Sequence, residues 1–227
     1  MEEKKQAVRA DPADAAEQRK KPVLSCIDCA AEHCGRQNSR YPDFCLTTGV
    51  DPEMFSEAMA LYGDPVNNAV AVAAAEVEGD YYMQLTRVEE IMKFAEKIGA
   101  KKLGIATCAG LLSEARTAAR IFRKRGFEVF GVACKCGAQR KTGIGIPERC
   151  EEEAGPMMCN PILQAKYLNR EKVDLAIVIG LCVGHDSLIY KYIDCLTTTL
   201  VTKDRVLAHN PAAALYQADK YYKRLLK

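Results

Sequence analysis

The chain has no tryptophan, only three histidines among its 227 residues, and no strong excess of charge of either sign. So few histidines leave few candidates for an imidazole-based catalytic site. The 32 basic and 30 acidic residues give a formal net charge of +2, and the two signs are interspersed along the sequence. No nucleic-acid-binding surface is therefore predicted.

Long apolar runs are also missing. None reaches the length of about 20 residues that a membrane-spanning helix needs, and the start of the chain has no apolar segment typical of a secretion signal. Residues 1–22 carry too few apolar side chains to offset the entropy of ordering, so a disordered tail is expected there. These features predict a cytoplasmic protein with no membrane partner.

Cysteine, in contrast, is abundant. The chain has eleven, an odd number, and no secretion signal accompanies them. Reduced thiols in a cytoplasmic protein more often bind metals or carry out chemistry than form disulfides.

Asx-Pro dipeptides mark several expected helix starts. An Asp or Asn side chain caps the first free N–H groups, and proline fits the first helical position because its φ is preset. Further helices are indicated by apolar residues at helical spacing. The expected helices are 52–63, 65–79, 84–98, 111–126, 161–170 and 211–226, with another segment after Asp186.

Short apolar or β-branched runs alternate with these helices in the second half of the chain. They lie at 102–107, 128–133, 174–180 and 198–202. Strand–helix alternation is typical of βαβ units and a parallel sheet. We therefore predict an α/β fold: a Rossmann-like parallel sheet of about four strands with flanking helices at 100–227. A cysteine-rich module at 23–50 and a helical segment at 51–99 precede it, and 23–227 is expected to form one compact domain.

The cysteine-rich module contains a C-x2-C-x4-C-x10-C run. A C-x2-C pair can grip one ion across a tight turn, and two more thiolates complete a four-coordinate site. So short and polar a segment also needs the ion to become ordered. The predicted metal ligands are Cys26, Cys29, Cys34 and Cys45.

Four further cysteines lie next to the predicted strands and helices. Three follow strands directly or nearly so, and Cys159 precedes the helix that leads into the third strand. Loops at the carboxyl edge of a parallel sheet converge on one crevice, and a nearby helix N-terminus favours a thiolate. The sequence therefore predicts a second metal centre, with Cys108, Cys134, Cys159 and Cys182 as ligands; the alternative is that they are ordinary core cysteines.

The stretch LAIVIGLCVGHDSL places other candidates beside Cys182. Gly180 and Gly184 would let the backbone turn sharply and approach a bound cofactor. His185 is a candidate ligand, proton donor or polar helix-start residue, and Asp186 is expected to cap that helix. Roles for Cys136, Cys150 and His209 stay open, and Cys195 is expected in the core.

Several of these stretches resemble a family of predicted metal-binding proteins, domain-of-unknown-function family 1847, found mainly in anaerobic bacteria and archaea. The resemblance covers roughly residues 23–215. It is carried by CIDCAAEHC, GIATCAGLLSEA, CNPILQA, GLCVGHDSL and KDRVLAHNP. It implies metal binding in an anaerobic setting, but no established reaction.

Three functions remain open from the sequence. The first is a metalloprotein whose expected cofactor is a 4Fe–4S or other iron–sulfur cluster. It would carry out redox or small-molecule chemistry at the sheet edge, with a small molecule or an electron-transfer protein as partner. The second is a zinc-stabilised module that binds a small ligand without catalysis, zinc being the alternative especially at the N-terminal site. The third is a thiol enzyme with Cys182 as nucleophile and His185 as base. The sequence does not indicate an oligomeric state.

Overall fold

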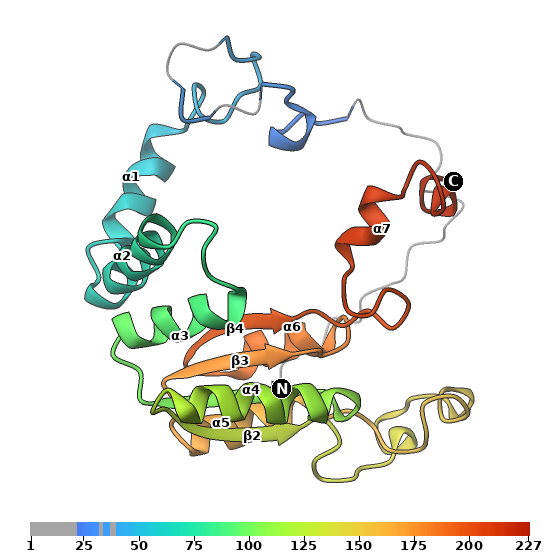
Figure 1. The fold of residues 1–227 in the computed structure, drawn as a ribbon. Helices are drawn as coiled ribbons and strands as arrows, with labels where there is room; N and C mark the ends of the chain where they lie inside the picture. Colours follow the sequence, from blue (N-terminus) through green and yellow to red (C-terminus); the bar gives the residue numbers. More distant parts are fainter. Residues whose placement is uncertain (1–21, 32–33, 37–39) are drawn as a thin grey trace, which may run out of the picture. The chain divides into compact units, whose positions relative to one another are not determined.

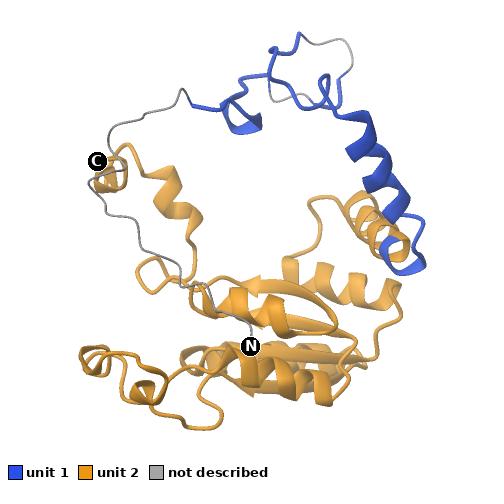
Figure 2. Ribbon diagram, turned by 180° about the vertical axis from the view of Figure 1, so that it is seen from behind, with its two compact units in different colours: residues 1–67 blue, residues 68–227 orange. Residues whose placement is uncertain are grey.

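The computed structural model describes residues 22–31, 34–36 and 40–227. The predicted tail at 1–22 therefore lies, except for its last residue, outside the described residues. The chain divides into two compact units, residues 1–67 and 68–227 (Figure 2). This boundary falls within the segment 51–99 that the sequence marks as helical.

The second unit is built on a four-stranded sheet in which all strands are parallel. Its strands are β1 (Lys102–Thr107), β2 (Glu128–Ala133), β3 (Leu175–Ile179) and β4 (Leu196–Val201). They lie side by side in the order β2-β1-β3-β4 (Figure 1). The predicted α/β fold with a parallel sheet is confirmed, and β1 and β3, the two central strands, carry nearly continuous buried residues.

Helices cover both faces of the sheet, as Figure 1 shows. The helices are α3 (Arg87–Lys97), α4 (Leu112–Lys124), α5 (Pro161–Arg170) and α6 (His185–Tyr192). One core cluster joins α3 and α4 to Leu103, Ile105 and Ile177. A second cluster joins α5 and α6 to Ala106, Ala176 and Val178 on the opposite face. Alternate residues of each central strand thus anchor different helix layers.

Three of the four Asx-Pro dipeptides expected to start helices do so, and Asn210-Pro211 does not cap α7 (Ala212–Tyr216). Asp51 Oδ1 accepts from Glu53 N at 2.9 Å at the start of α1 (Pro52–Leu61). At α2 (Pro65–Asp80), the Asp64 carboxylate caps the first turn in the same way. Asn160 Oδ1 accepts from Leu163 N at 2.9 Å at the start of α5. Among the described residues, no helix is long and apolar enough to cross a membrane.

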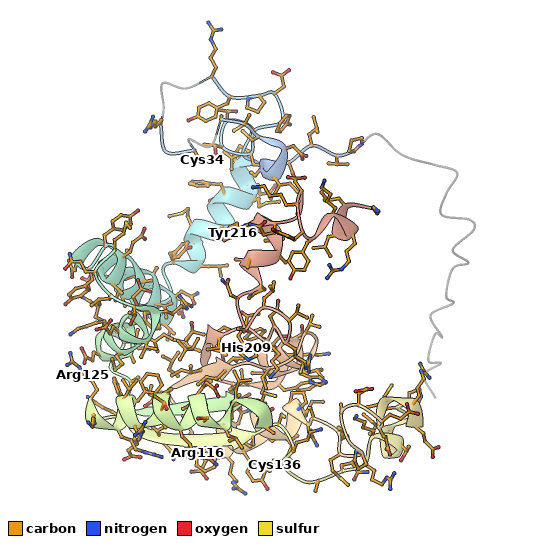
Figure 3. All side chains as sticks on the ribbon, turned by 45° about the vertical axis from the view of Figure 1, so that its right-hand side comes forward. Cys34, Arg116, Arg125, Cys136, His209 and Tyr216 are labelled. Atoms are coloured by element: carbon orange, nitrogen blue, oxygen red, sulfur yellow. The ribbon has the colours of Figure 1, made fainter. Side chains whose placement is uncertain are left out.

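Two predicted helix features are wrong. The helix expected at 211–226 is only α7 (Ala212–Tyr216), because its apolar side chains have no core to pack on: Tyr216 is 76% exposed (Figure 3). Asp186 does not cap α6. The helix begins at His185, and Gly184, with φ of +83°, holds the cap position.

Gly180 makes the sharp turn after β3, and alanine there should destabilise the fold. Its φ is +68°, and an added Cβ would lie 2.5 Å from Cδ2 of the buried Leu111. We expect Gly180→Ala to lower the free energy of unfolding by about 2–4 kcal/mol. Gly184 also has a positive φ, but a Cβ added there would meet open space. Gly184→Ala should therefore lower the free energy of unfolding by only about 1 kcal/mol. Denaturant unfolding measures both, and equal losses would contradict the clash with Leu111.

Candidate functional site

The structure brings three of the four predicted strand-edge cysteines close enough to interact. Cys108 follows β1, Cys134 follows β2, and Cys159 lies just before α5. The Cys134 thiol is hydrogen-bonded to those of both Cys108 and Cys159. Cys182, in the loop between β3 and α6, lies near enough to interact electrostatically with Cys159. All four side chains therefore lie at the carboxyl edge of the sheet, and we call them the edge cysteines.

Backbone hydrogen bonds beyond the strands hold two of these loops in register. Cys134 N donates to Thr107 O at 2.8 Å, and Cys108 N donates to Ile179 O at 3.2 Å. Gln164, fully buried on α5, donates from Nε2 to Thr107 O and Val132 O at 3.1 and 2.6 Å. Gln164 thus ties the ends of β1 and β2 together where their cysteines begin. Sequence reasoning missed it, because a buried glutamine looks like any polar helix residue.

Positive groups surround the edge cysteines. Arg205 Nη2 lies 2.8 Å from Cys182 Sγ, and Lys203 Nζ lies 3.5 Å from Cys108 Sγ. Lys135 is close enough to Cys159 to lower the pKa of its thiol, and its ammonium also donates to Met157 O. Lys203 acts to lower the pKa of Cys108, and Lys135 that of Cys159, because a nearby positive charge favours a thiolate. Sequence reasoning missed all three. Lys203 and Arg205 could have been found, because the stretch KDR at 203–205 comes just after the last strand and so lies at the same edge.

A compact loop after β4 positions Arg205. Asp204 Oδ1 accepts from Val206 N and Leu207 N at 2.9 and 2.8 Å. Asp204 N in turn donates to Nδ1 of His209, labelled in Figure 3, at 3.1 Å. His209 has a positive φ of 65°, which this local hydrogen bonding supports. The structure therefore gives His209 a positioning role in the loop.

The thiols of the edge cysteines differ in acidity because they form a directed chain of hydrogen bonds. The hydrogen bond to Cys134, together with burial, raises the pKa of Cys108 to about 12. The hydrogen bond from Cys134, aided by Lys135, lowers the pKa of Cys159 to about 7. For Cys134 the bond with Cys108 lowers the pKa, but the bond to Cys159 and burial outweigh it, and the pKa is raised. At this helix start the backbone N–H of Gly110 lowers the pKa of Cys108, but the hydrogen bond to Cys134 and burial outweigh it.

These pKa values predict the alkylation of the metal-free protein. The Cys159 thiol loses its proton as pH rises through about 7, so its rate of reaction with iodoacetamide should rise through that pH. Cys108, whose pKa is raised, should react far more slowly over the same pH range. Cys134→Ala removes the donor and should move the Cys159 half-point upward, while Cys136→Ala should leave it unchanged. Mass spectrometry of modified peptides measures this, and an unmoved half-point in Cys134→Ala would contradict the hydrogen-bonded chain.

His185 begins α6 at the same edge, and it is half-buried. Burial lowers its pKa, although Asp186 and Cys108 oppose this. Within the described part of the chain, the bond between His185 and Cys182 is between backbone atoms: His185 N donates to Cys182 O at 2.9 Å. Cys182 is held by Arg205, and a Cys182–His185 nucleophile–base pair therefore lacks its side-chain hydrogen bond.

The N-terminal cysteines gather in the first unit. Cys26, Cys29, Cys34 and Cys45 line one small cavity of about 80 Å³; Cys34 is labelled in Figure 3. Backbone N–H groups of Ala31 and Thr47 lie 3.4 Å from the sulfurs of Cys29 and Cys45. The pKa of Cys45 is lowered, first by the backbone N–H of Thr48. Such N–H···S bonds stabilise thiolates.

The three remaining cysteines, Cys136, Cys150 and Cys195, belong to neither of these two groups. Cys195 precedes β4 at the opposite edge of the sheet and has a pKa raised by burial. It is partly buried and packs against the second core cluster rather than lying within it. Cys136 also packs against that cluster. Cys150 is exposed at the end of the 3-10 helix Glu148–Cys150.

Both cysteine groups supply soft thiol donors, but their present spacing is not that of a metal site. Among the described residues, no three His, Cys, Asp or Glu side chains stand in a geometry that could hold an ion. The chemistry of the donors suits zinc or an iron–sulfur cluster. Metal binding would require the Cys134 thiol to give up its hydrogen bonds to Cys108 and Cys159.

The chain is similar to proteins whose function is not described. Residues 45–200 match the family described as protein of unknown function (DUF1847). An uncharacterized protein of Methanocaldococcus jannaschii is 46% identical over 169 residues, which cover 73% of this chain and 84% of that relative. No solved structure matches the chain.

Proposed function

Because the chain belongs to the DUF1847 family, whose description gives no reaction, we propose a function from its own residues: it is a thiolate metalloprotein. The edge cysteines hold an iron–sulfur cluster at the carboxyl edge of the sheet. A second centre, iron–sulfur or zinc, is held by Cys26, Cys29, Cys34 and Cys45. The setting is anaerobic and cytoplasmic, where thiols and clusters are protected from oxidation.

One observation carries this proposal: four loops, each remote from the others in sequence, bring a cysteine to the same edge of the sheet. Contact between Cys108, Cys134 and Cys159, with Cys182 nearby, gathers four soft donors in one place. An isolated buried cysteine is ordinary core packing, but core packing alone gives no reason for four to meet at a ligand-binding edge.

The surrounding charges also support a thiolate centre. Four thiolates concentrate negative charge in a partly buried place, and such charge requires compensation. Lys203 and Arg205 contact two of the sulfurs directly, and Lys135 acts on a third. Backbone Ala109 N donates to Cys134 Sγ at 3.3 Å. Cations and N–H groups beside sulfur are also what tunes cluster potentials.

The edge is suited to electron transfer or small-molecule chemistry. A bound cluster would supply one-electron chemistry. Val183, 94% exposed in the same loop as Cys182, shows that this loop meets solvent, where a small molecule or an electron-transfer protein can approach. Gly180 and Gly184 keep the backbone of this loop compact around Cys182, and half-buried His185 can donate a proton nearby.

A dithiol function is the second candidate, favoured by the contact between Cys134 and Cys159. With a pKa of about 7, the Cys159 thiolate can attack the disulfide of a small-molecule oxidant. The first attack forms a mixed disulfide with Cys159 and releases one thiol of the oxidant. Cys134 would then attack the Cys159 sulfur of this mixed disulfide, which forms a Cys134–Cys159 disulfide and releases the second thiol. This candidate predicts a colourless, metal-free protein.

Metal analysis of anaerobically purified protein separates these functions. The proposal predicts iron and acid-labile sulfide, with broad absorption near 400 nm that bleaches on reduction. Zinc without iron, in a colourless protein, would support the ligand-binding alternative. A metal-free protein that instead consumes a disulfide substrate would support the dithiol candidate, and either result would refute the iron–sulfur centre.

A further inference from the structure

A hollow of about 430 Å³ lies between α4 and strand β2, on the sheet face that α4 covers. Three arginines of α4, Arg116, Arg120 and Arg123, line it; Figure 3 labels Arg116 beside α4. We call this hollow the arginine groove. Its volume falls within the range of small-molecule sites, about 300–1,000 Å³.

The three arginines form one row along α4. Positions four and then three residues apart share one side of a helix, and at a rise of about 1.5 Å per residue the row spans about 10 Å. Ion pairs in the described part of the chain involve other arginines, such as Arg125, whose Nε lies 2.9 Å from Glu96 Oε1. Arg123 instead donates to Val129 O at 3.0 Å, which fixes its side chain without neutralising it.

Small residues form one part of the lining, which we call the floor of the groove; Ile105, Leu112 and Val129 line other parts. Ala115 and Ala119 of α4 face Gly131 and Ala133 of β2 there. Packing does not require the glycine, because a Cβ at Gly131 would lie an ordinary 3.7 Å from Ile105 Cβ. Glycine weakens a strand, and within one it often marks a close approach by a ligand. β2 is also an edge strand, so the groove opens beside the border of the sheet.

We propose that the arginine groove binds an organic polyphosphate with a flat apolar body, of which a nucleoside diphosphate is the simplest. Guanidinium groups bind phosphate oxygens bidentately. A row of unpaired cations about 10 Å long matches several linked negative charges better than a single carboxylate. The flat ring would lie on the small floor between Ala119 and Gly131. This site is separate in chemistry from the edge cysteines and does not depend on a metal.

Calorimetric titration of the full chain with ADP at low salt tests the proposal. ADP should bind, pyrophosphate should bind more weakly, and added salt should weaken both. Arg116→Ala and Arg120→Ala should each lower the affinity for ADP about tenfold, as loss of a charge-assisted hydrogen bond predicts. Gly131→Val should block the floor and weaken ADP more than pyrophosphate.

Two matched variants serve as controls. Arg149 is an exposed arginine outside the groove, so Arg149→Ala should bind ADP normally. Cys182→Ala should also bind ADP normally, whether or not the thiolate centre exists. Absence of ADP binding, or equal weakening by Arg149→Ala and Arg116→Ala, would overturn the proposal. Binding of a polyglutamate peptide without ADP binding would make the groove a protein-docking surface and would equally overturn the ligand class.

Discussion

Cys182→Ala should abolish the strand-edge metal centre while the protein stays folded. Cys182 is only partly buried and is held by Arg205 rather than by the core, so its removal should change the free energy of unfolding by less than about 1 kcal/mol. Loss of a direct thiolate ligand should weaken metal binding by more than about 100-fold, since even loss of a residue that only orients a ligand weakens it by 10–100-fold.

Iron, acid-labile sulfide and the absorption spectrum of anaerobically purified Cys182→Ala measure this effect. The matched control is Cys195→Ala, which removes a partly buried cysteine at the opposite edge of the sheet and should keep the full metal content. A Cys182→Ala protein with as much iron and sulfide as Cys195→Ala would show that Cys182 is not a ligand.

Cys29→Ser should remove the N-terminal centre and unfold the segment that carries it. Among the described residues of 22–50, no large apolar side chain is fully buried, and Val23 and Ile27 are more than 90% exposed. Without an ion, little compensates the entropy of ordering such a segment. The second unit has its own core and should stay folded.

Limited proteolysis combined with metal analysis reads out both effects. Cys29→Ser should lose one centre and be cleaved rapidly between residues 23 and 50, while residues 68–227 remain resistant. Cys150→Ser, a substitution at an exposed cysteine of the second unit, should match the wild type in both measurements. Unchanged metal content and unchanged cleavage in Cys29→Ser would refute a metal site in this module.

The sheet could be predicted from the sequence because its signals are local. The run 102–107 matches β1 residue for residue, and the Asx-Pro pairs mark the starts of α1, α2 and α5. Because the strands of a parallel sheet run in the same direction, Cys108 after β1 and Cys134 after β2 must lie at the same edge, however the side chains pack. These parts of the site follow from topology alone.

The parts that could not be predicted depend on contacts between distant residues. Lys203 and Arg205 reach the sulfurs only because the loop after β4 folds back on Asp204 and His209. The raised pKa of Cys108 arises from the neighbouring thiol of Cys134 and from burial, and the spacing of cysteines in the sequence gives neither. The helix predicted from Pro211 ends early because nothing buries its apolar side chains, which sequence periodicity cannot show.

The central claim is that the edge cysteines hold an iron–sulfur cluster. The most direct measurement is iron and acid-labile sulfide per chain in anaerobically purified Cys29→Ser, which isolates the strand-edge centre from the N-terminal one. The account predicts a brown protein whose iron and sulfide disappear when Cys182→Ala is added. A folded, colourless protein without iron or sulfide would contradict it.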